Sequence, residues 1–189
     1  ILDGVWQADR EHLAGCHEEI MRLTRLIEDL GALTSLEWEQ ISLNKTDFDL
    51  AELLRVTAEQ FKAAVDAKGI NLITRLVPCP INADYDRLKQ VFINLLSNAV
   101  AYTDEGSITI ALEPFAAGRR ISVADTGTGI SPEDLPHIFE RLYRADKSRN
   151  RNSGGAGIGL AIAAAIVSAH GGTITAESNA GGTTFYVEL

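Results

Sequence analysis

The 189-residue chain has few cysteines, few aromatic residues and no long apolar segment. Its two cysteines, Cys16 and Cys79, lie far apart, which argues against a disulfide scaffold and favours a reducing compartment. There is no Cys-x-x-Cys pair and no tight His/Cys cluster, so the sequence does not predict a structural zinc site. No apolar run approaches the roughly 20 residues that a membrane-spanning helix needs, and we expect the chain itself to be soluble.

Basic residues are also scarce, with 17 lysines and arginines against 26 acidic residues and a net charge of −9. This balance argues against general nucleic-acid binding. Nine of the acidic residues lie within residues 1–43, against three basic ones. Residues 141–151 reverse the balance, with five basic residues and one aspartate. Such a basic island predicts a compact anionic ligand, and a solvated polar loop is the alternative.

The chain divides into two parts by its hydrophobic pattern. It begins at Ile1 without a methionine or a signal peptide, which predicts a piece of a longer polypeptide. Apolar residues follow three-and-four spacing over residues 13–33, and this pattern predicts a long helix that needs a partner helix to cover its stripe. We therefore expect a bundle-forming helix with its connector over residues 1–43 and a globular domain over residues 44–189.

The second part alternates helical and strand patterns, which predicts an α+β two-layer sandwich. Asp49 and Glu52 have the spacing of a capping box, and the helix that they begin is expected to reach Lys68 and to end at Gly69. The other predicted helices cover Tyr85–Tyr102, a short stretch after Pro132, and Ala156–His170. The predicted strands cover Ile70–Leu76, Ser107–Glu113, Arg120–Ala124, Thr173–Glu177 and Thr184–Leu189, and Pro78 and Pro80 bound a loop.

Two polar side chains stand out on the second of these helices. Asn94 and Asn98 lie one turn apart in an otherwise apolar segment. Amides in such surroundings need buried partners or a ligand, and an amide oxygen suits a hard cation such as Mg²⁺. The alternative is a pair of core asparagines that bond to neighbouring backbone.

Two glycine-rich segments have the composition of ligand-binding loops. Asp125 to Ile130 follows a strand, and its glycines allow close backbone approach while the carboxylate can accept a hydrogen bond from an exocyclic amine. An ordinary turn has the same composition. Gly154 to Leu160 runs into a helix, whose free N–H groups can hold phosphate. It lacks the Lys-Ser/Thr ending of a P-loop, and a flexible linker is the alternative.

In their order and spacing these motifs resemble the catalytic ATP-binding region of bacterial sensor histidine kinases, which belong to the GHKL superfamily and have the Bergerat ATP-binding fold. The resemblance covers residues 44–189, and residues 1–43 resemble the second helix of the dimerisation and histidine-phosphotransfer hairpin. The asparagine helix resembles the N box, Asp125–Ile130 the first glycine box, Phe139–Arg144 the F box, Gly154–Leu160 the second glycine box, and Gly181–Phe185 the last glycine motif.

The resemblance implies a protein-histidine kinase that uses ATP and Mg²⁺. In that reading Asn94 and Arg144 are catalytic, Asn98 binds Mg²⁺, Asp125 binds the adenine amine, and Arg144 approaches the γ-phosphate. The implied nucleotide site consists of Asn94, Asn98, Tyr102, Asp125, Gly127, Gly129, Ile130, Phe139, Tyr143, Arg144, Gly155, Gly157, Ile158, Gly159, Leu160 and Thr183.

A few positions depart from the family pattern. Ala101 stands where a basic residue is common, so one phosphate contact is missing, and Ala180 stands where a glycine is common. Leu142 replaces a phenylalanine and Ile158 replaces a leucine, and we expect both to remain apolar anchors.

The resemblance also implies partners and alternatives. None of the four histidines has the His-Glu-x-x-x-Pro context of the phosphoacceptor, which we therefore expect upstream of Ile1. The implied partners are a response regulator with a receiver domain and a second copy of the chain bound through the bundle helix, in the cytoplasmic part of a membrane-anchored sensor. A GHKL-type ATPase and a degenerate nucleotide-binding or dimerisation module are the alternatives. The ATPases place a glutamate base where this chain has Asn94, and an amide is a poor base for water.

Overall fold

The computed structural model describes residues 41–115, 118–144 and 157–189. These residues lie in one compact unit, Glu37–Leu189. The bundle helix expected over residues 13–33 and the phosphate-loop residue Gly155 lie outside the described residues. So do Lys147, Arg149 and Arg151 of the basic island.

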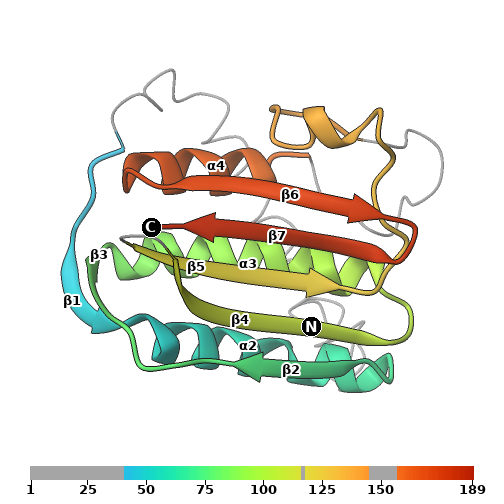
Figure 1. The fold of residues 1–189 in the computed structure, drawn as a ribbon, viewed down its shortest axis with the longest axis horizontal. Coiled ribbons are helices and arrows are strands. Elements are labelled where there is room, and N and C mark those ends of the chain that lie inside the picture. The colour runs from blue at the N-terminus through green and yellow to red at the C-terminus, as the bar shows by residue number, and fades with distance from the viewer. Residues whose placement is uncertain (1–40, 116–117, 145–156) are drawn as a thin grey trace, which may run out of the picture. The chain divides into compact units, whose positions relative to one another are not determined.

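A five-stranded mixed sheet forms one layer of the fold (Figure 1). Its strands in spatial order are β2 (Asn71–Arg75), β4 (Ser107–Phe115), β5 (Gly118–Asp125), β7 (Gly182–Glu188) and β6 (Thr173–Asn179). β2 pairs with β4 in parallel, and the remaining pairs are antiparallel. Alternate residues of the central strands, such as Ile108 and Ile110 of β4, are completely buried, so one face of the sheet belongs to the core.

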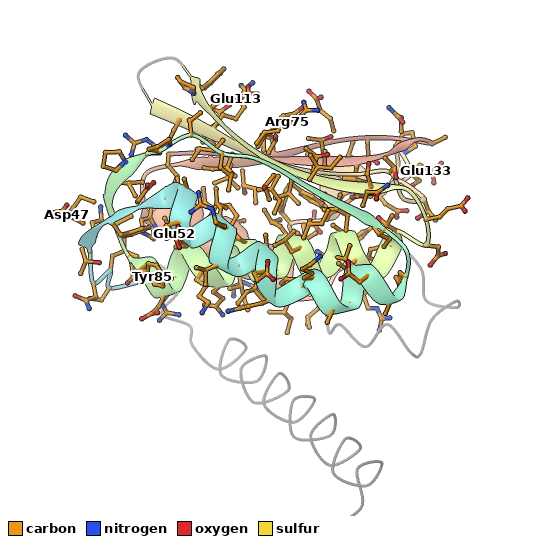
Figure 2. The ribbon with its side chains drawn as sticks, turned by 90° about the horizontal axis from the view of Figure 1, so that it is seen from below. Asp47, Glu52, Arg75, Tyr85, Glu113 and Glu133 are labelled. Carbon is orange, nitrogen blue, oxygen red and sulfur yellow. The ribbon has the colours of Figure 1, made fainter. Side chains whose placement is uncertain are left out.

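Three helices cover that face of the sheet, as the view in Figure 2 shows. They are α2 (Leu50–Ala67), α3 (Tyr85–Tyr102) and α4 (Gly159–Ala169). The predicted α+β two-layer sandwich is confirmed. α3 is the central helix, because it packs against both α2 and α4. Its buried residues recur every three or four positions along one face: Leu88, Val91, Phe92, Leu95, Leu96 and Ala99.

Both ends of α3 are fixed by polar contacts. At the start, the buried Asp84 carboxylate accepts hydrogen bonds from the N–H groups of Arg87 at 3.0 Å and Asn44 at 2.8 Å. Burial opposes its ionisation, but these hydrogen bonds outweigh that effect and lower the pKa of Asp84. At the far end, the Lys68 ammonium donates to the carbonyls of Val100 (2.7 Å) and Thr103 (2.9 Å). α3 has no basic residue in its own last turn, so Lys68 supplies the charge that favours this helix end.

The loop expected between Pro78 and Pro80 is followed by a strand that the sequence pattern did not predict. β3 (Pro80–Ala83) pairs antiparallel with β1 (Thr46–Asp49), and together they form a separate two-stranded sheet. The Phe48 ring meets the Tyr85 ring edge-on at 5.1 Å between centroids, which attaches this small sheet to the first turn of α3. Pro80 therefore bounds the loop as predicted, but the strand that it begins was not predicted, although proline is tolerated as the first residue of a strand.

The short helix expected after Pro132 is a single 3₁₀ turn, Leu135–His137. Each of the other predicted helices and strands is present among the described residues, with ends that differ by a few positions. No helix in residues 41–115, 118–144 and 157–189 combines the length and the apolar character needed to cross a bilayer.

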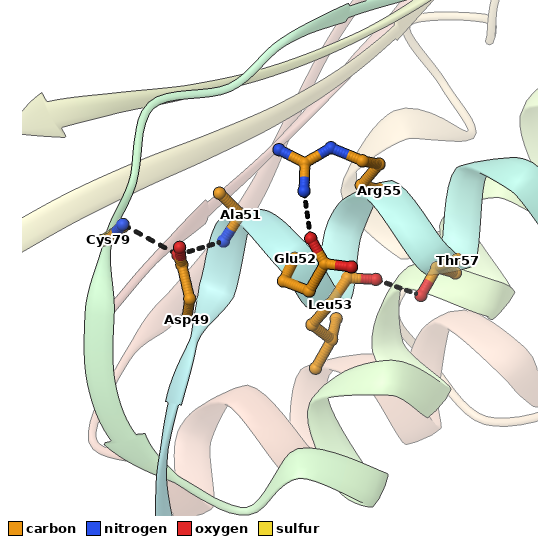
Figure 3. A network of polar contacts seen from close by, with 7 residues as sticks. All are labelled: Asp49, Ala51, Glu52, Leu53, Arg55, Thr57 and Cys79. Atoms are coloured by element: carbon orange, nitrogen blue, oxygen red, sulfur yellow. Dashed lines mark hydrogen bonds and ion pairs between the residues drawn. The ribbon is translucent and has the colours of Figure 1, made fainter.

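The first turn of α2 is capped differently from the sequence prediction (Figure 3). Asp49 is the N-cap, and its Oδ1 accepts the N–H of Ala51 at 2.9 Å. The same oxygen accepts the N–H of Cys79 at 2.8 Å, so one carboxylate joins the helix start to the chain just before β3. Glu52 forms an ion pair with Arg55 on the helix surface. The expected cap is confirmed, but Glu52 is engaged with Arg55 and the reciprocal arm of a capping box is not formed.

This arrangement predicts that Asp49 and Glu52 contribute unequally to stability. Asp49→Ala leaves two N–H groups without their partner and should lower the free energy of unfolding by about 1–2 kcal/mol. Glu52→Ala removes only an exposed ion pair and should cost less than about 0.5 kcal/mol. Urea unfolding of both variants measures the difference. Equal losses would contradict this assignment and support a full capping box.

Candidate functional site

Asp125 lies at the end of β5, and only 9% of its surface is exposed. Its Oδ1 accepts the N–H of Gly127 at 2.9 Å and the N–H of Thr183 at 3.3 Å. Burial raises the pKa of Asp125, and the two hydrogen bonds oppose this effect only in part. Within the described residues, the structure gives Oδ2 no hydrogen-bond partner. A buried carboxylate with one oxygen held and the other without a partner can accept a hydrogen bond from a ligand.

Backbone segments approach each other closely around Asp125. A Cβ atom on Gly127 would overlap the carbonyl oxygen of Tyr102, at the end of α3. A Cβ atom on Gly182 would overlap the carbonyl oxygen of Asp125 itself. Gly129 has φ +72° and would overlap the carbonyl of Asn179. These three glycines are therefore required by space, and Gly129 and Gly182, which has φ +131°, also by their backbone conformation.

A side-chain network that the sequence analysis missed fixes the loop after Asp125. The Ser178 hydroxyl accepts the N–H of Ile130 at 2.8 Å and donates to the carbonyl of Gly182 at 3.0 Å. It also lies 2.9 Å from the hydroxyl of Thr183, which faces it across the β6–β7 pair. The signal for Ser178 was the hairpin register, because residues paired across two strands share one side of the sheet.

The two asparagines of α3 have different environments. Nδ2 of Asn94 donates to the carbonyl oxygen of Gly159 at 2.9 Å, which joins α3 to the first residue of α4. Asn98 is half-buried, and the structure gives its side chain no hydrogen bond within the described residues. One turn further on, Tyr102 is 57% exposed, and its carbonyl accepts the N–H of Thr128 at 3.2 Å. The ring of Tyr102 is thus available at the end of α3.

The F-box resemblance holds for some side chains and fails for another. The Phe139 ring meets the Phe185 ring edge-on at 6.3 Å, so Phe139 attaches this segment to β7. Ile158 is only 4% exposed, and its predicted role as an apolar anchor is confirmed. Leu142 is 55% exposed and has φ +62°, so its predicted anchoring role was wrong. A leucine in this left-handed conformation is held by its surroundings and not by burial of its side chain.

The chain around Leu142 lies directly beside the second glycine box. The N–H of Leu142 donates to the carbonyl of Gly157 at 3.0 Å. A Cβ atom on Gly157, which has φ +74°, would lie 2.6 Å from the carbonyl oxygen of Tyr143 and 3.1 Å from Cγ of Arg144. Arg144 is exposed. An arginine is thereby placed beside the residues that lead into α4.

The described part of the implied site is continuous. The end of α3 contacts the Gly127 loop, Asp125 contacts Thr183, Asn94 contacts Gly159, and Gly157 contacts Tyr143 and Arg144. Leu160, half-buried, follows Gly159 in the first turn of α4. Among the residues described, no three of histidine, cysteine, aspartate and glutamate converge as a metal-binding group.

A mixed sheet with helices on one face and a glycine-lined carboxylate at a strand end defines a class of nucleotide-binding α/β sandwich. The model of the family described as "Histidine kinase-, DNA gyrase B-, and HSP90-like ATPase" matches residues 83–189 of the chain. The chain belongs to this family. Within it, the chain is homologous to sensor histidine kinases.

Three comparisons illustrate the relation. The chain is 39% identical to the signal transduction histidine-protein kinase BaeS of Escherichia coli (strain K12), over 100% of this chain and 41% of BaeS. It superposes on full-length ShkA in complex with AMPPNP with a TM-score of 0.80 and 30% identity, over 97% of this chain and 39% of ShkA. Histidine kinase ThkA, solved in complex with the response regulator protein TrrA, gives a TM-score of 0.72 and 26% identity, over 98% of this chain and 52% of that chain. The chain thus spans about two fifths of the length of BaeS.

The raised pKa of Asp125 predicts that its charged form destabilises the fold near neutral pH. A carboxyl group whose pKa is raised by folding stabilises the fold at low pH, and this contribution is lost as the pH rises through the raised pKa. Asp125→Asn keeps an oxygen for the N–H groups of Gly127 and Thr183 but carries no charge. At pH 7 it should therefore unfold at a higher temperature than the unchanged chain.

Thermal unfolding followed by circular dichroism at pH 7 and at pH 4 tests this expectation. The difference between Asp125→Asn and the unchanged chain should shrink at pH 4, where more of the carboxylate is protonated. A variant that is less stable than the unchanged chain at pH 7 would refute the assigned cost.

Proposed function

We propose that this chain binds Mg²⁺-ATP and transfers the γ-phosphoryl group to a histidine, as the catalytic part of a two-component sensor kinase. The observation that carries the proposal is Asp125, a buried carboxylate at a strand end with one oxygen held and one without a partner. It lies among glycines that let neighbouring backbone segments approach it closely. The support from relatives is the membership of the family and the AMPPNP bound by ShkA.

The adenine subsite is proposed at Asp125 and the adjoining loop. Oδ2 of Asp125 would accept a hydrogen bond from the exocyclic amine of adenine, because Oδ1 already accepts two N–H groups. Gly127 and Gly129 would allow the loop to pack tightly against the carbonyls of Tyr102 and Asn179, so that its backbone can border the flat base. Ile130 and Thr183 would complete this subsite, and the exposed ring of Tyr102 would lie against the nucleotide.

The phosphate subsite is proposed between α3, the start of α4 and Arg144. Asn98 would bind Mg²⁺ through its amide oxygen, which is the kind of ligand that Mg²⁺ accepts. When bound, Mg²⁺ would neutralise phosphate charge. The N–H groups of Gly157, Ile158, Gly159 and Leu160 would donate hydrogen bonds to phosphate oxygens at the start of α4, where the helix dipole favours negative charge. Gly155 completes this loop in the family pattern, and Arg144 would approach the γ-phosphate with a permanent charge.

Transfer to an imidazole is favoured over hydrolysis by the character of Asn94. Its amide group cannot remove a proton from water, and its Nδ2 is already bonded to Gly159. Catalysis would then rest on positioning and charge neutralisation, which supply most of the acceleration in phosphoryl transfer. His170 is not available as the acceptor, because its Nε2 accepts the N–H of Asp84 at 3.0 Å and its Nδ1 lies 2.9 Å from the carbonyl of Ile166.

The wider assembly is proposed from the relatives. ThkA is complexed with a response regulator, and we propose that this chain likewise serves a receiver domain. We further propose that residues 1–43 supply the second helix of a dimerisation hairpin, that two copies associate through it, and that the whole protein is a membrane-anchored sensor with this part in the cytoplasm.

Calorimetric titration with Mg²⁺-ADP tests nucleotide binding. In Asp125→Asn the amide oxygen should keep its hydrogen bonds from the N–H groups of Gly127 and Thr183. The NH₂ group would then face the adenine amine, and two donors cannot form a hydrogen bond with each other. Affinity should fall by about tenfold or more, because a charge-assisted hydrogen bond is lost. The matched control is Asp86→Asn, an exposed aspartate in the first turn of α3, which should bind as the unchanged chain does.

The thermal unfolding of Asp125→Asn serves as the control, because a variant that unfolds no lower than the unchanged chain does not bind more weakly through misfolding. If the unchanged chain releases no heat with millimolar Mg²⁺-ADP, the degenerate-module alternative is correct.

Radiolabelled ATP tests the transfer step. With a second polypeptide that carries a His-Glu-x-x-x-Pro helical hairpin, acid-labile label should appear on that polypeptide, and phosphate release should be slow. The same hairpin with alanine for its histidine is the control and should remain unlabelled. Asn98→Ala should slow the transfer by about a hundredfold, the usual effect of removing one group that stabilises transition-state charge. Rapid phosphate release without label on the hairpin would instead identify an ATPase.

A further inference from the structure

A carboxylate and a phenol outside the proposed phosphate contacts form a short hydrogen bond. The Tyr143 hydroxyl donates to Oδ1 of Asp134 at 2.6 Å. The other oxygen of Asp134 accepts the hydroxyl of Ser131 at 2.7 Å, and the N–H of Asp134 donates to the same Ser131 oxygen at 3.1 Å. The hydrogen bond from Tyr143 lowers the pKa of Asp134 and raises that of Tyr143. We refer to these two residues as the Asp134–Tyr143 pair.

The pair closes a compact turn of the chain. Between its members, the N–H of Glu140 donates to the carbonyl of His137 at 2.8 Å. Nδ1 of His137 lies 2.7 Å from the carboxylate of Glu140, and the His137 ring lies 5.4 Å from the Tyr143 ring. The turn is tied to β7 through Phe139, whose ring meets Phe185. The Tyr143 side chain is therefore held at both its ring and its hydroxyl.

The next residues along the chain depend on that anchorage. Leu142 has φ +62°, a conformation that leucine disfavours, and its side chain is exposed, so its own packing does not hold it there. Its N–H bonds to the carbonyl of Gly157, and Gly157 in turn packs against Tyr143 and Arg144. Two residues later, the carbonyl oxygen of Gly159 accepts a hydrogen bond from Nδ2 of Asn94. Contacts thus run without interruption from the Asp134–Tyr143 pair to the asparagine helix.

We propose that the Asp134–Tyr143 pair positions Arg144 and Gly157 relative to Asn94 and thereby sets the preference of the site for a nucleoside triphosphate over a diphosphate. The inference rests on the proposed function, in which Arg144 acts on the γ-phosphate. Tyr143 and Asp134 are positioning residues in this account, because their polar atoms bind each other. The adenine subsite at Asp125 has its own support from Gly127 and Thr183 and does not depend on the pair.

The test compares ATP with ADP, each with Mg²⁺, in calorimetric titrations of the full 189-residue chain. Tyr143→Phe removes only the hydroxyl and should weaken ATP binding about threefold to tenfold, while ADP binding changes less than about twofold. Asp134→Ala should do the same. Asp134→Asn keeps an oxygen that can accept the Tyr143 hydroxyl, and it should retain most of the preference for ATP over ADP that Asp134→Ala loses. The matched control is Tyr186→Phe, which removes another hydroxyl bonded to a carboxylate, that of Glu177 at 3.3 Å.

A double-mutant comparison locates the effect at Arg144. In the Arg144→Ala background, Tyr143→Phe should produce no further change in the ratio of ATP to ADP affinity. Thermal unfolding of each variant measures any general loss of stability, which would weaken the two nucleotides alike.

The outcomes separate this inference from the proposed function. If the unchanged chain does not bind ADP, the proposed function fails and this inference fails with it. If the unchanged chain binds both nucleotides and Tyr143→Phe leaves their ratio unaltered, or weakens both equally, only the positioning role is overturned. An unequal loss that persists in the Arg144→Ala background also overturns it, because the effect would then not pass through Arg144.

Discussion

The two hydrogen bonds accepted by Oδ1 of Asp125 are the constraint on which the proposed site depends. They join the end of β5 to the start of β7 and fix the turn at Gly127, whose backbone then lies against the end of α3. The chain buries a carboxylate there although burial disfavours its charge. A ligand can form a hydrogen bond with such a destabilised carboxylate, and carboxylates with perturbed pKa values cluster at functional sites.

Much of the fold could be predicted because local signals and packing agree. The apolar spacing of α3 predicted both of its ends correctly, and every strand of the main sheet was expected near its observed place. The β1–β3 pair was missed because its partners, such as Phe48 and Ile81, are more than thirty residues apart and each strand has only four residues. The capping box was half wrong, since sequence spacing does not reveal that Glu52 pairs with Arg55.

The site was predicted from ordered motifs, and its errors lie where side chains are placed by tertiary contacts. Asn94, Asp125 and the glycines stand where the motif pattern indicated, in one continuous set of contacts. Ser178 carries no motif, and its role follows only from the register of β6 against β7. Leu142 was expected to be buried because it replaces an aromatic residue, but the turn closed by Tyr143 leaves it exposed with a left-handed backbone.

The Lys68 contact with the end of α3 bears on where a folded unit can be cut. The segment shared with the family starts at residue 83, yet the lysine that caps α3 comes from the end of α2. Without the preceding residues, α3 would lose this cap together with the helix that covers one of its apolar sides, and the sheet would lose β2. The segment that defines the family is therefore smaller than the unit that folds: α2 and β2 belong to the same cooperative body as the nucleotide-binding motifs.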